Sequence, residues 1–522
     1  MASERSEKGM EDIMNILIEE LKKLPKFCDY IDNIEKQTSP IALSGLSSVG
    51  KVQLIEATKE FAGKNILLIT YNDIQAKRIV EDLKYFSQNV LYFPKRDIAA
   101  YDYDASNKDL PYERIETIKI QQMGKNYFGG NFIVVTTIEA LMQKMIAKED
   151  LVSKVINFRV GESHDLEELK EKLVNLGYER ADIVDGKGQF SIRGGIVDIG
   201  TDNSKGIRIE FWGDEVDSIR TFSIATQRSN NMLEEASVYP ASEFVLVKSL
   251  DEICKSIVEK NSAYEEEDIE LIKNGEYFSK IDKYFNSFHT KQSTFLDYIT
   301  DDFLICVDDL SKINARQANI INDNNELIKS LIEKERFVPD SIKNVSKVNI
   351  ENIDNNQIIY LEENDVLNEN NNLEFSRNVY NFKYRDVHFY KSEINLLIEQ
   401  IKANIDNKVK FVVLAGNEAG ANKIGKLLQQ EDINYKYIEN LNENNNEKIY
   451  KKSARENYEK NQVIISNGVL SSGFRNYDLN LVVITGEEFL VVNKKRKKRS
   501  DAFSQGEKVV FADLASRRLC CT

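Results

Sequence analysis

Short apolar runs alternate with segments of helical spacing along the first part of this chain. A strand that is buried on both faces has apolar side chains almost throughout, whereas a half-exposed strand alternates. The runs and the helical segments between them therefore predict an α/β domain, in which helices cover both faces of a parallel sheet. The runs occupy residues 41–43, 65–69, 132–135 and 303–307, and the helical segments 10–28, 72–86 and 137–146.

A different pattern interrupts this domain. Between residues 188 and 222 the polarity alternates with a period of two, so that Ile207 and Ile209 face one way and Arg208 and Glu210 the other. This pattern favours a small antiparallel α+β module, which we place at residues 151–240. Because the run at 303–307 would complete the first sheet, we expect a discontinuous first domain. Its two parts are residues 1–150 and 241–345.

A second, smaller α/β domain is expected at residues 346–490. Its predicted strands are 410–414, 463–465 and 481–484, and its predicted helix is 418–430. Asparagine-rich tracts at 351–372 and 440–447 are typical of loops. The six consecutive basic residues at 494–499 indicate a solvated linker, 491–508.

The composition excludes several classes of protein. The net charge is −15, with 70 basic and 85 acidic residues, so nucleic-acid contact would need a local basic patch. Five scattered cysteines and three histidines indicate neither a disulfide framework nor a metal site. No apolar run approaches the ~20 residues of a membrane span, and the N-terminus lacks the apolar core of a signal peptide. We therefore expect a cytoplasmic protein without a membrane partner.

One segment has the pattern of a phosphate-binding loop. Residues 45–52 read Gly-Leu-Ser-Ser-Val-Gly-Lys-Val and lie between a predicted strand and a predicted helix. In such loops backbone N–H groups surround a phosphate, the lysine reaches its oxygens, and a following Ser or Thr holds Mg²⁺. Here Val52 replaces that ligand. We expect a degenerate phosphate loop without a catalytic residue or cofactor, formed by Gly45, Gly50 and Lys51. The alternative is an active ATPase or helicase that uses Lys51 and Asp308.

The most distinctive motifs lie in the predicted module. They are Gly177-Tyr178-Glu179-Arg180, the strand from Gly188 to Ile199 with Arg193-Gly194-Gly195, and the segment Arg208–Arg220 with Glu210-Phe211-Trp212-Gly213-Asp214-Glu215. Together they resemble the module shared by the excision-repair subunit UvrB and the bacterial transcription-repair coupling factors. The strand from Gln189 to Asp198 is the more similar to the coupling factors. The interval from Tyr103 to Glu116 is too short for the long DNA-threading hairpin of UvrB.

The resemblance implies a function for the module. In both families it docks UvrA, which implies that UvrA is a partner of this chain. The candidate UvrA-binding residues are Arg180, Lys187, Phe190, Arg193 and Arg220. The alternation with a period of two is equally compatible with Phe190 as a core residue. We expect Trp212 to anchor the core or a turn.

The coupling-factor family also implies partners outside this region. The segment Gly506–Leu514 resembles the start of its RNA-polymerase-interacting domain, so we place a truncated start of that domain at residues 509–522. From Ala515 the sequence departs from the family, as it would after a frameshift, an assembly break or a truncation of the gene. The family contacts RNA polymerase and double-stranded DNA and carries a translocase motor that uses ATP and Mg²⁺. In this chain the regions for these functions would be mostly absent. We expect an adaptor. Active ATP hydrolysis, or binding of damaged DNA as by UvrB, are the alternatives.

Overall fold

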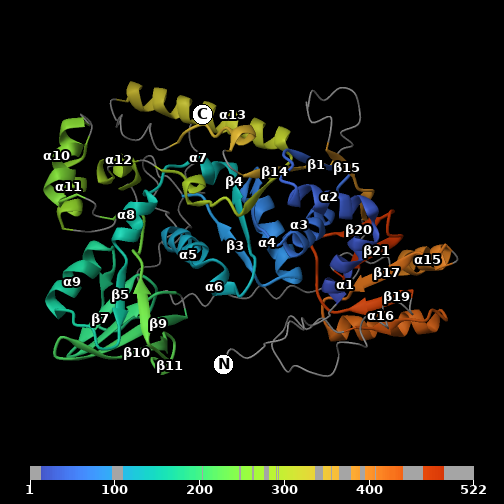
Figure 1. Ribbon diagram of the computed structural model, residues 1–522, viewed down its shortest axis with the longest axis horizontal. Coiled ribbons are helices and arrows are strands. Elements are labelled where there is room, and N and C mark those ends of the chain that lie inside the picture. The colour runs from blue at the N-terminus through green and yellow to red at the C-terminus, as the bar shows by residue number, and fades with distance from the viewer. Residues whose placement is uncertain are drawn as a thin grey trace, which may run out of the picture.

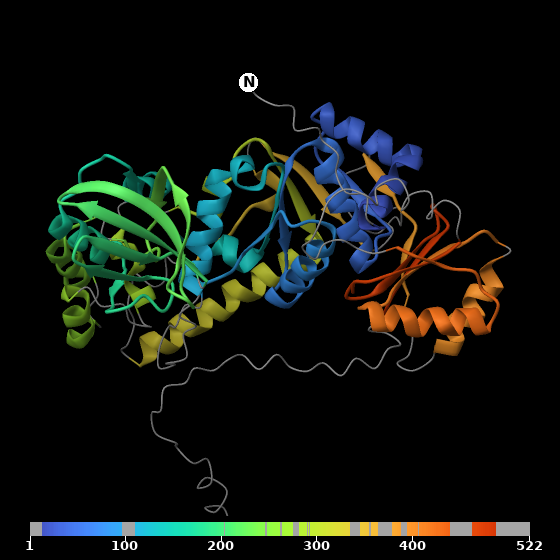
Figure 2. The same cartoon turned by 90° about the horizontal axis from the view of Figure 1, so that it is seen from below.

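A computed structural model of the chain shows three units in a row (Figure 1, Figure 2). A parallel-sheet unit lies in the middle, the antiparallel module at one end, and a smaller α/β unit at the other. The structure describes residues 13–96, 110–202, 204–245, 248–260, 264–274, 281–289, 291, 293–334, 345–353, 356–363, 378–387, 394–405, 407–438 and 462–486. The predicted linker 491–508, the segment 509–522 and the tract 440–447 lie outside these residues.

The central unit is built on a seven-stranded sheet whose neighbouring strands all run parallel. The predicted apolar runs form four of its strands, and nearly all of their side chains are buried. The α/β class is confirmed. In spatial order the strands are β15 (Val379–Asn381), β1 (Ile41–Ser44), β14 (Gln357–Leu361), β13 (Phe303–Asp308), β2 (Asn65–Thr70), β4 (Ile133–Thr137) and β3 (Val90–Phe93).

This sheet extends beyond the predicted boundary at residue 345. Strands β14 and β15 pair on either side of β1, although the sequence analysis assigned their residues to the next domain. The boundary is therefore too early. The error has a physical reason: β14 lies inside the asparagine-rich tract 351–372, whose composition indicates a loop, and β15 is only three half-buried residues long.

The helices cover both faces of the central sheet. The predicted helix 72–86 is confirmed as α4, and the side chain of Asn72 caps its first turn. Over the described residues 13–28, the helix predicted at 10–28 is interrupted at Leu24, because Pro25 begins a new helix. The predicted helix 137–146 ends at Met142, where the chain becomes extended. The helices before the module are α1 (Ile13–Glu19), η1 (Glu20–Lys23), α2 (Pro25–Glu35), α3 (Ser48–Ala62), α4 (Asp73–Phe86), α5 (Leu110–Met123), α6 (Lys125–Phe128), α7 (Ile138–Met142) and α8 (Lys148–Ser153).

The module contains a six-stranded sheet, a two-stranded sheet and one helix. The inner face of the larger sheet and Leu169 and Leu173 of its helix belong to one buried cluster. The expected alternation is confirmed, since Ile207, Ile209 and Phe211 are all buried. The elements are β5 (Ile156–Arg159), α9 (Leu166–Asn175), β6 (Glu179–Arg180), β7 (Gln189–Arg193), β8 (Ile196–Gly200), β9 (Lys205–Trp212), β10 (Glu215–Ser223), β11 (Ser229–Leu233) and β12 (Glu235–Val238). The order of the larger sheet is β11-β10-β9-β8-β7-β6.

A buried ionic cluster joins the module to the central unit. Arg114 of α5 is fully buried, and its Nε donates to Glu243, just after the module. Arg96 lies 3.0 Å from Asp282 and 3.7 Å from Glu243. His289 is buried beside them. Because removing one partner of a buried ion pair is costly, these contacts fix the end of the module on the central unit. The helices that follow the module are α10 (Leu250–Lys260), α11 (Glu266–Lys273), η2 (Ile281–Tyr284), α12 (Phe285–Phe288), η3 (Phe295–Tyr298), α13 (Leu310–Glu333) and η4 (Ile350–Asn352).

In the third unit, the described residues form a six-stranded mixed sheet and two helices. Ser471 donates two hydrogen bonds to Asp82 of α4, from its N–H at 2.7 Å and from its hydroxyl at 2.6 Å. Lys26 of α2 is paired with Asp478 at 2.5 Å. These contacts hold the unit against the helices of the central unit. Its elements are β16 (Tyr384–Val387), α15 (Ile394–Ile405), β17 (Lys410–Leu414), α16 (Glu418–Gln430), β18 (Lys436–Tyr437), β19 (Val463–Ser466), β20 (Gly473–Asn476) and β21 (Leu481–Thr485).

Within the described ranges, no helix is both long enough and apolar enough to cross a membrane.

Candidate functional site

The predicted phosphate loop connects β1 to α3, as expected. Two of its backbone donors, however, bind within the protein. The Gly50 N–H donates to the hydroxyl of Ser47, which caps α3, at 3.1 Å, and the Leu46 N–H donates to the Glu362 carbonyl at 3.3 Å. In a phosphate site such donors would face the anion.

Lys51 also has partners within the chain. Its Nζ lies 2.6 Å from Asp308 at the end of β13 and 3.1 Å from Glu363, and only 2% of its side chain is exposed. Asp308 also accepts a hydrogen bond from Thr70 at 2.9 Å. Burial by itself lowers the pKa of Lys51, but attraction to Asp308 and Glu363 outweighs it and raises the pKa above its ordinary value. Lys51 is therefore a charged, buried ion-pair partner.

The segment after β15 covers the start of the loop. The Tyr384 N–H donates to the Gly45 carbonyl at 2.9 Å, and the ring of Tyr384 lies so close to Gly50 that a Cβ there would be 2.6 Å from it. Val52 is fully buried in the main apolar cluster and has no side-chain oxygen to offer a metal ion. The residues present therefore do not fit a nucleotide with Mg²⁺. No group of three or more potential metal ligands was found in the part of the chain that the structure describes.

The solvent-facing side of the larger module sheet is the second candidate site, and we call it the outer face. Residues directly opposite each other in an antiparallel pair point to the same side of a sheet. The pairs Arg193–Ile196, Ile196–Glu210, Asp198–Arg208, Arg208–Arg220, Arg220–Met232 and Trp212–Glu215 therefore share one side. The outer face comprises Arg193, Ile196, Asp198, Arg208, Glu210, Trp212, Glu215, Ser218, Arg220 and Met232.

Asp198 organises the centre of the outer face. Its carboxylate is fully buried beneath two arginines. Arg208 binds it with two nitrogens, at 2.6 and 2.9 Å, and Arg193 binds it at 2.6 Å. A paired, forked contact of this kind fixes the orientation of a guanidinium group. Because 47% of the Arg193 side chain stays exposed, that group can reach a partner from a fixed position.

Arg220 and Arg180 differ in their surroundings. Arg220 lies 3.7 Å from Glu210, with 35% of its side chain exposed. Arg180 is exposed on β6, the edge strand, at the level of Phe190 on β7. From strand geometry, the backbones of Arg180 and Arg193 are about 11 Å apart. The structure thus brings Arg180, Arg193 and Arg220 to one sheet, with Arg193 and Arg220 on its outer face.

Two predicted residues lie elsewhere. Phe190 is fully buried and packs in the core of the module, so its side chain presents no surface to a partner. The reason is its position opposite Ile199, on the inner side of the sheet. Lys187 lies over the ring of Tyr112 of α5, 5.6 Å from its centre, at the end of β7 away from Arg193.

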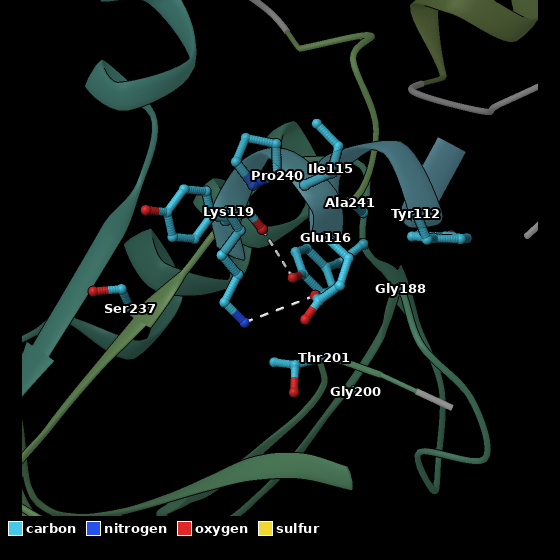
Figure 3. Close-up of a pocket in the computed structure, with 12 residues that line it drawn as sticks. Tyr112, Ile115, Glu116, Lys119, Gly188, Gly200, Thr201, Ser237, Pro240 and Ala241 are labelled. Carbon is cyan, nitrogen blue, oxygen red and sulfur yellow. Dashed lines mark hydrogen bonds and ion pairs between the residues drawn. The ribbon is translucent and has the colours of Figure 1, made fainter. Parts of the chain in front are cut away.

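Lys187 thus lies at the seam between the module and α5, and other residues that line this seam are drawn in Figure 3. Glu116 and Lys119 of α5 face Thr201 of the module across this seam, and Tyr112 packs against Gly188. The cavity between them is about 20 Å³, room for one water molecule. The seam is packed structure and offers no space for a ligand.

The sequence analysis missed two conspicuous residues of the outer face. Trp212 is 84% exposed and Met232 is 71% exposed, so the expectation that Trp212 anchors the core or a turn is wrong. A signal was present. The alternation that turns Arg208 and Glu210 outward also turns Trp212 outward, two residues further along the same strand.

Comparisons with known proteins agree with this geometry. Residues 156–244 match the family described as the UvrB interaction domain, which covers the module with its outer face. The module is therefore similar to the UvrB interaction domain.

The whole chain is similar to a particular group of proteins. It is 25% identical over 509 residues to the transcription-repair-coupling factor of Bacillus subtilis (strain 168), covering 94% of this chain and 41% of that protein. It is 27% identical over 515 residues to that of Staphylococcus haemolyticus, covering 93% and 42%. The chain is thus similar to the transcription-repair-coupling factors over most of its own length and spans about two fifths of theirs.

Proposed function

We propose that this chain is a docking unit that recruits UvrA in transcription-coupled DNA repair, and that the outer face of the module is its binding surface. The observation that carries the proposal is the placement of Arg193. Asp198 holds it in a fixed orientation while nearly half of its side chain remains exposed. A fixed arginine loses less freedom on binding than a mobile one, and its fork suits a carboxylate of a partner. The match to the UvrB interaction domain supports UvrA as that partner.

The similarity to transcription-repair-coupling factors supports the wider role. In this proposal UvrA is brought to RNA polymerase that has stalled on damaged DNA. Contacts with polymerase and DNA, and displacement of the polymerase by an ATP-driven motor, would be made by parts of the relatives that the match does not cover. The chain itself would act as an adaptor and not as an ATPase. The buried pairing of Lys51 with Asp308 favours this role.

A direct binding experiment tests the proposal. The purified chain is mixed with purified UvrA, without ATP or RNA polymerase, and passed over a sizing column at low salt. We expect co-elution of the two proteins, and separate elution would contradict the proposal. Mg²⁺-dependent ATP turnover by the chain alone, abolished in Lys51→Ala, would instead favour an enzyme. Tight binding of the chain alone to lesion-bearing DNA would favour a damage-binding subunit.

A further inference from the structure

The large apolar side chain of Trp212 is exposed to solvent. This residue is the only tryptophan of the chain and is 84% exposed. Ile196, on the neighbouring strand of the same face, is 37% exposed, and Met232 at the far corner is 71% exposed. Single exposed apolar side chains are ordinary, but several on one face of one sheet mark a surface for interaction.

The geometry of the neighbouring hairpin explains why no side chain from its turn covers the indole ring. Since Ile196 is opposite Glu210, the two-glycine turn that precedes Ile196 lies level with Trp212. The Phe211 N–H donates to the Gly195 carbonyl at 2.7 Å, and a Cβ on Gly195 would lie 2.6 Å from the Phe211 carbonyl oxygen. Glycine thus lets the turn approach β9 closely and adds no side chain beside the ring. On the other side, the only directly paired residue is Glu215.

Net charge cannot be the main source of binding energy on this face. Its arginines are Arg193, Arg208 and Arg220 and its acids are Asp198, Glu210 and Glu215, so that 3 − 3 = 0. Arg208 is already paired within the face. A neutral face gives little long-range steering, and the free energy of binding must then come chiefly from burial of apolar surface, with Arg193 supplying direction.

We propose that Trp212 is the aromatic anchor of the UvrA interface. This inference rests on the proposed function and deepens it. The partner surface has an apolar slot that takes the indole, and carboxylates beside that slot within reach of Arg193. Tryptophan and arginine are the residues most enriched among interface positions that dominate affinity, and they act in pockets from which water is excluded.

The test uses the full chain and purified UvrA. Trp212→Ala should weaken equilibrium binding at least about 30-fold, because such anchors contribute about 2 kcal/mol or more and 1.4 kcal/mol is tenfold. Its melting temperature should stay unchanged, since the side chain has almost no contacts to lose. The matched control is Ile74→Ala, which removes a side chain that is 82% exposed on α4, outside the module. We expect no change in its binding.

Fluorescence provides a second readout that a merely structural role would not move. Spectra of UvrA mixtures are recorded with the wild-type chain and with Trp212→Phe, and their difference isolates Trp212. The emission should shift to the blue when UvrA binds. An unshifted difference spectrum, or Trp212→Ala binding as tightly as wild type, would overturn the anchor while leaving UvrA docking intact. A blue shift with rising concentration of the chain alone would assign the face to a second copy and also overturn it. If wild type fails to bind UvrA, the proposed function fails and the anchor fails with it.

Discussion

Replacing Lys51 by Met tests whether the phosphate loop is a structural ion pair or a working site. Lys51 and Asp308 are 2.6 Å apart, and at an effective dielectric constant of about 20 their attraction is roughly 6 kcal/mol. Lys51→Met keeps the shape of the side chain but leaves the Asp308 carboxylate buried with Thr70 as its remaining neutral partner. Breaking a buried pair in this way costs about 3–5 kcal/mol.

The assay is differential scanning calorimetry of the full chain. For a domain of this size, 3–5 kcal/mol corresponds to a fall in melting temperature of roughly 6–20 °C. Lys312→Met is the matched control. It removes a 43% exposed lysine that also contacts Glu363, and such pairs contribute under about 1 kcal/mol. The double variant Lys51→Met/Asp308→Leu should recover most of the loss, since replacing both members of a buried pair by apolar groups is often neutral.

The result that would refute this reasoning is equally specific. If Lys51→Met lowers stability no more than Lys312→Met does, Lys51 is not held as a buried ion-pair partner. If ATP with Mg²⁺ also raises the melting temperature of wild type but not of Lys51→Met, the loop is a nucleotide site.

Three further predictions concern the module and its junctions. Burial, with Arg96 nearby, lowers the pKa of His289 to about 3; between pH 6.5 and 3 the unfolded chain therefore binds a proton that the folded chain does not. The contribution of neutral His289 to the free energy of unfolding is therefore complete above pH 6.5 and is smaller by about 2 kcal/mol at pH 5. Urea unfolding of His289→Leu should show a flatter pH profile, and an unchanged slope would contradict the assignment. Asp198→Asn should lower the free energy of unfolding by about 2–3 kcal/mol, because it removes the charged partner shared by two arginines. The control Asp217→Asn, at an exposed position of the same sheet, should lower it by less than about 0.5 kcal/mol. Equal urea midpoints for the two variants would show that the pairing does not stabilise the module. Gly188→Ala should cost at least about 1 kcal/mol by thermal unfolding, because residue 188 has φ +76° and its Cβ would meet the Tyr112 ring; a neutral effect would mean that the seam is loose.

The central sheet was predictable because its strands are buried on both faces. Continuous apolar runs identified β1, β2, β4 and β13, and the alternating pattern identified the module. Strand β15 was not predictable in this way. It has only three half-buried residues, and its place beside β1 depends on pairing with a strand more than 330 residues earlier in the chain.

The candidate site was predictable only in part. The motif identified Arg193, and alternation alone could have placed Trp212 on the same side of the sheet. The ion pairs of Asp198 with two arginines depend on the registers of three strands, which no local sequence pattern specifies. For the same reason the Lys51–Asp308–Glu363 contacts were not foreseen. They join the loop to two positions 257 and 312 residues away.

Equilibrium binding to UvrA, measured by titration calorimetry with three forms of this chain, tests the central claim most directly. Wild type should bind, and Arg193→Glu should bind at least about tenfold more weakly, because it reverses the charge of the exposed, oriented guanidinium. Arg159→Glu should bind like wild type, although Arg159 is in the same module and is 66% exposed beside Glu235, because it lies on the two-stranded sheet and not on the outer face. Equal affinities for wild type and Arg193→Glu, or an equal loss in Arg159→Glu, would contradict docking through the outer face.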